Sequence, residues 1–103
     1  MEQEGVVYVL TNPTMPGLVK IGKIIHGSTE ERMSTLYNSS VPVPFECQFA
    51  AKVQNANETE IALHQAFAPN RINPRREFFD IEPEQAIVFF KAYCSRRRNS
   101  PNP

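Results

Sequence analysis

The 103-residue chain has only four glycines, only two cysteines and no net charge. It contains no glycine-rich phosphate loop and no GxSxG, HExxH or CxxC motif, which argues against a dinucleotide enzyme, a serine hydrolase and a zincin. Cys47 and Cys94 lie far apart in the sequence, so neither a disulfide framework nor a zinc site is predicted. These absences leave few of the common enzyme classes open.

Eleven basic residues balance eleven acidic ones, so overall charge favours no particular partner. Seven of the eleven basic residues are arginine, the side chain suited to forked contacts with phosphate. No apolar run approaches the length of a membrane span, and no signal peptide opens the chain. We therefore expect no membrane association and an intracellular location, cytoplasmic or in the nucleoid or nucleus. The length suits one domain, with a core over about residues 6–95 and a disordered tail at 99–103.

Two β-branched runs, residues 6–11 and 18–23, flank a loop with two prolines and a glycine. This pattern predicts an antiparallel hairpin joined by a loop rather than by a tight turn. If Leu10 lies opposite Leu18, then Tyr8 lies opposite Lys20. A phenol beside an ammonium would favour the phenolate form. The alternative is that Tyr8 is an ordinary strand aromatic and Lys20 a solvated edge residue.

The rest of the chain predicts three helices and one more strand. Ser28 and Glu31 form a capping box that begins a helix over 28–37. A strand is expected over 45–53, and a second helix runs from Asn57, its predicted N-cap, to about residue 68. An irregular segment, 68–76, and an extended or turn-like stretch, 77–81, precede a third helix that begins at Pro83 and runs to about Cys94. The order β-β-α-β-α-α predicts an α+β fold, a small three-stranded antiparallel sheet flanked by helices.

Three groups of residues could carry chemistry. Arg32 lies in the first turns of its helix, where a helix N-terminus favours phosphate, although a surface ion pair with glutamate explains it equally well. Glu60 and His64 are four residues apart on one helical face, and a carboxylate there could hold Mg²⁺. Alternatively, Glu60 completes a helix cap and His64 is a half-buried histidine, while Glu58 competes for either role.

The third group is basic. Arg71, Arg75 and Arg76 precede Glu77, and the segment 96–98 is a run of arginines. Such residues can neutralise backbone phosphates, although solvated loop charge is the ordinary interpretation. We place Lys23, Arg71, Arg75 and Arg76 in an expected nucleic-acid contact set.

Taken in order, these motifs resemble the GIY-YIG nuclease superfamily, and within it a small branch known from a T5 phage reading frame and a meiotically up-regulated yeast gene. The resemblance covers about residues 6–81 and rests on the ordered set of motifs rather than on any one of them. The matching residues are Val7-Tyr8-Val9, Val19-Lys20-Ile21-Gly22-Lys23, Thr29, Arg32, Pro42-Val43-Pro44-Phe45, Glu60-Ile61-Ala62-Leu63-His64, Phe67, Arg71 and Arg76-Glu77-Phe78-Phe79.

The resemblance implies a metal-dependent phosphodiesterase that cleaves DNA, with RNA still open. Tyr8 matches the tyrosine that helps to deprotonate the attacking water, and Arg32 matches the arginine that stabilises the phosphate. Glu60 matches the ligand of Mg²⁺ or Mn²⁺. Lys20 stands in the place of the second superfamily tyrosine and is counted with Tyr8, Arg32 and His64 as catalytic.

Two features of the chain depart from the superfamily pattern. Glu77 lies about where an asparagine often completes the active site, and we expect no added DNA-binding domain of the kind that many relatives carry. A chain with one active site would nick one strand per encounter. The alternatives are a non-catalytic nucleic-acid-binding or regulatory module, which would need its arginines but no metal, and a protein-interaction domain. Oligomeric state and preferred nucleic-acid structure stay open.

Overall fold

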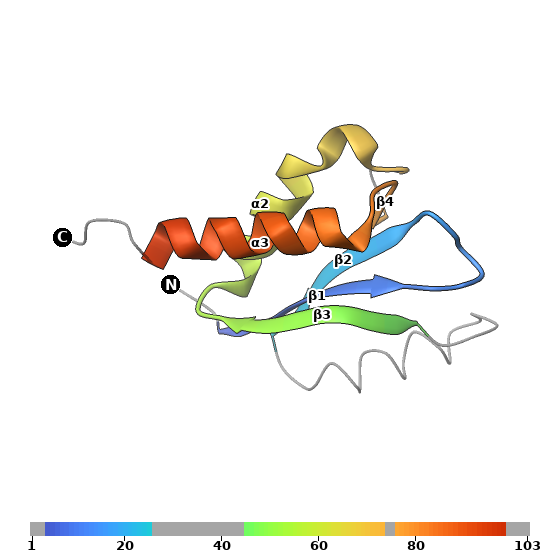
Figure 1. The fold of residues 1–103 in the computed structure, drawn as a ribbon. Helices are drawn as coiled ribbons and strands as arrows, with labels where there is room; N and C mark the ends of the chain where they lie inside the picture. The colour runs from blue at the N-terminus through green and yellow to red at the C-terminus, as the bar shows by residue number, and fades with distance from the viewer. Residues whose placement is uncertain (1–3, 26–44, 74–75, 99–103) are drawn as a thin grey trace.

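The computed structural model describes residues 4–25, 45–73 and 76–98. They form a four-stranded antiparallel sheet in the order β3-β1-β2-β4, and helices α2 and α3 cover one of its faces (Figure 1). The elements are β1 (Gly5–Thr11), β2 (Val19–Ile24), β3 (Glu46–Val53), α2 (Ala56–Ala66), the 3₁₀ turn η1 (Ala68–Asn70), β4 (Phe78–Phe79) and α3 (Pro83–Arg98). Within the described chain, neither helix has the length and apolar character needed to cross a membrane.

The β1–β2 hairpin forms as predicted, but its expected register is wrong by two residues. Tyr8 lies opposite Gly22, and Leu10, rather than Tyr8, lies opposite Lys20. The loop explains the difference, because it is closed by local bonds: the amides of Thr14 and Met15 donate to the side chain and the carbonyl of Asn12. An even shift keeps every side chain on its expected face, so Tyr8 and Lys20 still share one side of the sheet.

The two faces of the sheet carry separate apolar clusters. Alternate residues of β1 and β2, including Val7, Val9 and Ile21, pack against Leu63 of α2 and Phe90 of α3. The opposite face is built on Tyr8, Leu10, Ile24 and Phe45. Both faces are therefore apolar at β1, which makes this central strand almost completely buried.

The N-cap of helix α2 lies two residues earlier than the sequence suggested. The predicted N-cap, Asn57, is wrong: the side-chain oxygen of Asn55 accepts a hydrogen bond from the Glu58 amide at 3.0 Å, and Asn57 lies inside the helix. The strand expected over 45–53 is confirmed by β3, and Pro83 begins α3 as predicted, although that helix continues to Arg98.

The expected count of three strands is wrong, because Phe78 and Phe79 form a fourth. They pair with Lys20 and Val19 on the outer edge of β2, and Arg71 adds an isolated bridge to Phe79. The stretch was predicted only as extended or turn-like, since two residues are too few to show a strand periodicity. The helix expected over 28–37 and the tail at 99–103 lie outside the described residues.

Candidate functional site

On the edge of β2 that faces away from β1, the pairing with β4 stops before Ile21. The partners of the short strand β4 on β2 are Val19 and Lys20, so Ile21 meets other groups. Its amide donates to the Glu77 carbonyl at 3.1 Å, and its carbonyl lies 3.0 Å from His64 Nε2. A carbonyl oxygen can only accept, so Nε2 carries a hydrogen here. The segment before β4 and helix α2 are thereby brought to one point on the sheet edge.

Three potential metal ligands gather at this point. Glu60 and His64 from α2 and Glu77 from the segment before β4 each offer a ligand atom, and these atoms lie within 4.8 Å of one another. His64 is held by its bond to Ile21 and by the ring of Phe79, with 5.2 Å between the ring centroids. We call Glu60, His64 and Glu77 the edge cluster.

Glu60 is the most buried member of the edge cluster, with 7 % of its side chain exposed. Oε1 accepts a hydrogen bond from Lys23 Nζ at 2.8 Å. No described residue donates a hydrogen bond to Oε2, and His64 Nε2 lies 3.9 Å from it, beyond hydrogen-bond distance. A buried carboxylate oxygen without a donor is costly, and it is uncommon in stable proteins unless a ligand satisfies it.

A divalent cation fits this donor set. Carboxylate oxygens are the ligands that Mg²⁺ and Mn²⁺ prefer, and Glu60 Oε2 is a buried oxygen that still lacks a partner among the described residues. Glu77, with 34 % of its side chain exposed, would supply the second oxygen on the solvent side. His64 could bind through Nε2 only by giving up its bond to Ile21. Glu60 and Glu77 are therefore the residues best suited to hold the ion.

Two lysines contribute positive charge from β2. Lys23 projects from the helix-covered face to Glu60, whereas Lys20 projects from the opposite face. Lys20 Nζ lies 3.4 Å from Glu77 Oε1 and 5.0 Å from the ring centroid of Phe78. Because Lys20 is directed to Glu77 and Phe78, and lies opposite Leu10, the expected direct pairing of its ammonium with Tyr8 is not observed.

Tyr8 approaches the same stretch of β2 from the opposite face. It is buried, with 1 % of its surface exposed, and its ring lies across Gly22. A methyl group built on Gly22 would lie 2.6 Å from Tyr8 Cζ and would meet the hydroxyl as well. Gly22 sits between Ile21, which binds His64, and Lys23, which binds Glu60. The Tyr8 hydroxyl and the edge cluster therefore converge on residues 21–23.

The model of the T5orf172 domain matches residues 5–94. This chain belongs to the T5orf172 domain family. The family is nuclease-like and is associated with nuclease and DNA-binding activity. No curated protein and no solved structure gives a significant match. The matched part of this T5orf172 domain includes β1, β2, β3, α2 and β4, and thus the whole edge cluster.

The remaining predicted site residues are not members of the edge cluster or lie outside the described residues. Arg71 Nε donates to the Arg76 carbonyl at 2.7 Å, and its guanidinium lies 5.5 Å from the Phe79 ring centroid, so Arg71 holds its own turn together. Arg76 is exposed. Arg32 and Arg75 lie outside the described part of the chain.

The sequence assigned no role to Glu77 of this T5orf172 domain, whereas the structure places it in the edge cluster. Its signal was its position directly before two aromatic residues that can pair as a strand. That pairing presents the side chain of the preceding residue at the sheet edge, where Ile21 binds the Glu77 carbonyl.

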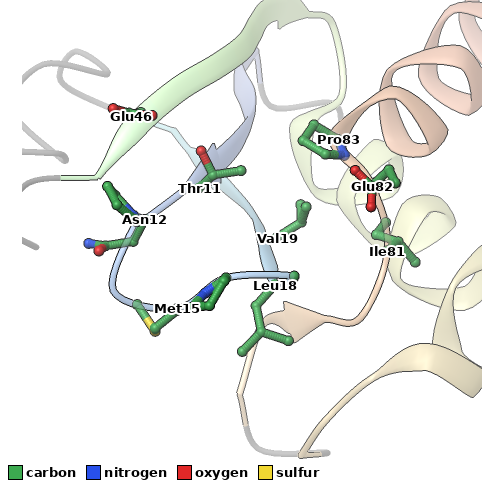
Figure 2. Close-up of a pocket in the computed structure, with 12 residues that line it drawn as sticks. Thr11, Asn12, Met15, Leu18, Val19, Glu46, Ile81, Glu82 and Pro83 are labelled. Carbon is green, nitrogen blue, oxygen red and sulfur yellow. The ribbon is translucent and has the colours of Figure 1, made fainter.

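A pocket of about 270 Å³ opens at the loop end of the hairpin (Figure 2). It lies between the 12–18 loop and the start of α3, and its charged lining residues are Glu46 and Glu82. Two carboxylates with no basic lining residue repel a phosphate. This pocket is therefore not the place where the T5orf172 domain would bind a nucleic-acid backbone.

Proposed function

We propose that this T5orf172 domain is a GIY-YIG-type endonuclease domain that hydrolyses phosphodiester bonds in DNA with the help of a divalent metal ion. The observation that carries the proposal is the buried Oε2 atom of Glu60, which faces His64 and Glu77 and has no hydrogen-bond donor among the described residues. The family match and the ordered motifs around Tyr8 and Lys20 support the same function.

Glu60 and Glu77 would hold the metal ion. Mg²⁺ or Mn²⁺ in such a site supplies positive charge that polarises the phosphate and neutralises the leaving oxygen. His64 positions this pair: it ties helix α2 to the edge of β2 through the Ile21 carbonyl, and it keeps the ligand-bearing turn in register with Glu77.

Tyr8 would act on the attacking water. Its oxygen reaches the same stretch of β2 from the opposite face, and in the phenolate form it would accept the proton that the attacking water gives up. Lys20 adds positive charge beside Glu77, where charge builds on the phosphate. Arg32 would add a charge-assisted contact, a role inferred from the resemblance because Arg32 lies outside the described residues.

The nucleic-acid strand would approach from the exposed side of Glu77. Arg76, the residue directly before Glu77, is exposed there and can contact a neighbouring phosphate. One such centre per chain would cleave one strand per encounter, so nicking of duplex DNA is the expected reaction.

The proposal is tested by incubating supercoiled plasmid with the protein and Mg²⁺ or Mn²⁺. Wild type should produce nicked circles, and Glu60→Gln should reduce the rate by at least about 100-fold, because it removes the charged ligand while keeping the shape of the side chain. Glu58→Gln is the matched control: it makes the same change in an exposed residue of the same helix and should leave nicking unchanged. Arg32→Ala should reduce nicking but leave Mn²⁺ affinity as in wild type.

Two results would count against the proposal. Nicking by Glu60→Gln at the wild-type rate would show that the edge cluster is not the active site. DNA binding without cleavage, with an affinity that falls steeply as salt rises, would favour a non-catalytic nucleic-acid-binding module instead.

A further inference from the structure

The ion pair between Lys23 and Glu60 joins two residues of very different exposure. Lys23 lies on β2, opposite Val7, and its ammonium is 2.8 Å from Glu60 Oε1. The Glu60 side chain is 7 % exposed, whereas that of Lys23 is 29 % exposed. One partner is therefore fixed in the protein interior, and the other is a long, flexible side chain with access to water.

Lys23 makes the burial of Glu60 tolerable when no metal is bound. A buried carboxylate without a counter-charge is strongly destabilising. Lys23 is the described cation in direct hydrogen-bond contact with Glu60, since His64 is 3.9 Å away and is charged only if protonated. The Lys23 ammonium and a metal ion would thus both neutralise the charge of the Glu60 carboxylate.

We propose that Lys23 is a displaceable counter-ion: its ammonium neutralises Glu60 in the metal-free protein, and the divalent cation displaces it. This inference rests on the proposed function, because it takes Glu60 as a metal ligand. Two cations on one carboxylate repel each other, and the repulsion is strong in a site from which water is largely excluded. Lys23, the more exposed partner, is the one that can move to solvent.

The first test measures the affinity of the full chain for Mn²⁺, without nucleic acid, by titration calorimetry and by electron paramagnetic resonance of the free ion. Lys23→Met removes the competing charge and should tighten Mn²⁺ binding about tenfold. Lys23→Arg keeps the charge and should bind within about threefold of wild type. The control is Lys52→Met, the same change at an exposed lysine of β3, which should alter the affinity by less than about twofold.

The variants separate this inference from the proposed function. If Glu60→Gln binds Mn²⁺ as wild type does, Glu60 is not a ligand and both proposals fail. If Glu60→Gln loses binding and Lys23→Met binds no more tightly than wild type, the metal site stands and the counter-ion inference is wrong.

A second measurement uses only the wild-type protein, in case Lys23→Met does not fold. Lysine amines are acetylated with a reactive ester, with and without saturating Mn²⁺, and each site is quantified by mass spectrometry. Release of the ammonium should raise the labelling rate of Lys23 about threefold or more, because the amine then spends more time in solvent, while Lys52 serves as the internal reference. An unchanged or lower rate at Lys23 would mean that the ammonium stays on Glu60, which would overturn the inference.

Discussion

The ring of Tyr8 lies across the α-carbon of Gly22, its direct partner in the β1–β2 pairing. A side-chain carbon at Gly22 would come within 2.6 Å of Tyr8 Cζ and 2.9 Å of Cε1, so no other residue type fits beneath the ring without displacing it. Glycine at position 22 thus determines where the hydroxyl group of the buried Tyr8 lies. The hydroxyl lies beside the segment of β2 that also contacts Glu60 and His64.

Gly22→Ala should therefore disturb the proposed active site more than the small size of the added group suggests. The added methyl group would push the Tyr8 ring from its place, and an overpacked core of this kind costs about 1–3 kcal/mol of unfolding free energy. Displacing a reacting group by about 1 Å can lower a rate by about 100-fold. We expect both losses, measured by urea unfolding and by plasmid nicking.

Gly5→Ala is the matched control for this substitution. It adds the same methyl group to a buried glycine of β1, three residues before Tyr8, where it would lie 2.5 Å from the backbone oxygen of Ile24 and 3.0 Å from Ala56 Cβ rather than against the Tyr8 ring. It should lower the stability but leave the nicking rate of the folded protein unchanged. Wild-type nicking by Gly22→Ala would show that the position of the phenol is not important for the reaction.

Tyr8→Phe should separate the contribution of the Tyr8 hydroxyl from that of its ring. The ring would still fill the space across Gly22, so the unfolding free energy should fall by only about 1 kcal/mol, the usual contribution of one buried hydrogen bond. Loss of the proton acceptor should lower nicking by about 100-fold to 10,000-fold. Mn²⁺ affinity should not change, because Tyr8 is not among the proposed ligands.

The control for Tyr8→Phe is Tyr93→Phe on α3, a half-buried tyrosine whose ring stacks on Phe89. It should cleave as wild type does. If Tyr8→Phe also cleaves at that rate, another group deprotonates the water.

The N-cap of α2 gives a prediction about stability alone. Asn55→Ala removes the side-chain oxygen that accepts from the Glu58 amide, and it should lower the unfolding free energy by about 1 kcal/mol. Asn57→Ala makes the same chemical change at an exposed position inside the helix and should cost little. Urea unfolding of the two variants decides the matter, and an equal loss in both would contradict the assignment of Asn55 as the cap.

Arg71 and Arg76 should behave differently although they are neighbours in the structure. Arg71→Lys keeps the charge but loses the Nε donor to the Arg76 carbonyl, so it should mainly reduce stability, by about 1 kcal/mol. The Arg76 side chain is exposed, so Arg76→Ala should leave stability nearly unchanged.

For DNA binding we expect the opposite result: the substitution at Arg76 should have a larger effect on affinity than the substitution at Arg71. Arg76→Ala should weaken binding and lower the slope of log affinity against log salt by about one, as expected for one lost phosphate contact. The measurement is a salt series of fluorescence-anisotropy titrations with a labelled duplex. An unchanged slope would remove Arg76 from the contact surface.

Much of the fold was readable from local patterns. The alternation in 6–11 and 45–53 predicted strands that the structure contains, and Pro83 marked the start of α3. The side of the sheet shared by Tyr8 and Lys20 was also predicted correctly, because the observed register differs from the expected one by two residues and an even shift keeps each side chain on its face. Such features depend on residues within a few positions of each other, so a single sequence carries them.

Other features depend on residues that are distant in sequence. The strand of Phe78 and Phe79 exists because the edge of β2 is available to pair with it. The contact of Lys23 with Glu60 spans 37 residues, and Lys20 reaches Glu77 across 57. Packing of α2 and β4 against one strand edge brings these charges together, and no local pattern specifies which lysine meets which carboxylate. The sequence therefore predicted which residue types form the site. Which lysine pairs with which glutamate was decided by the way that elements distant in sequence pack on β2.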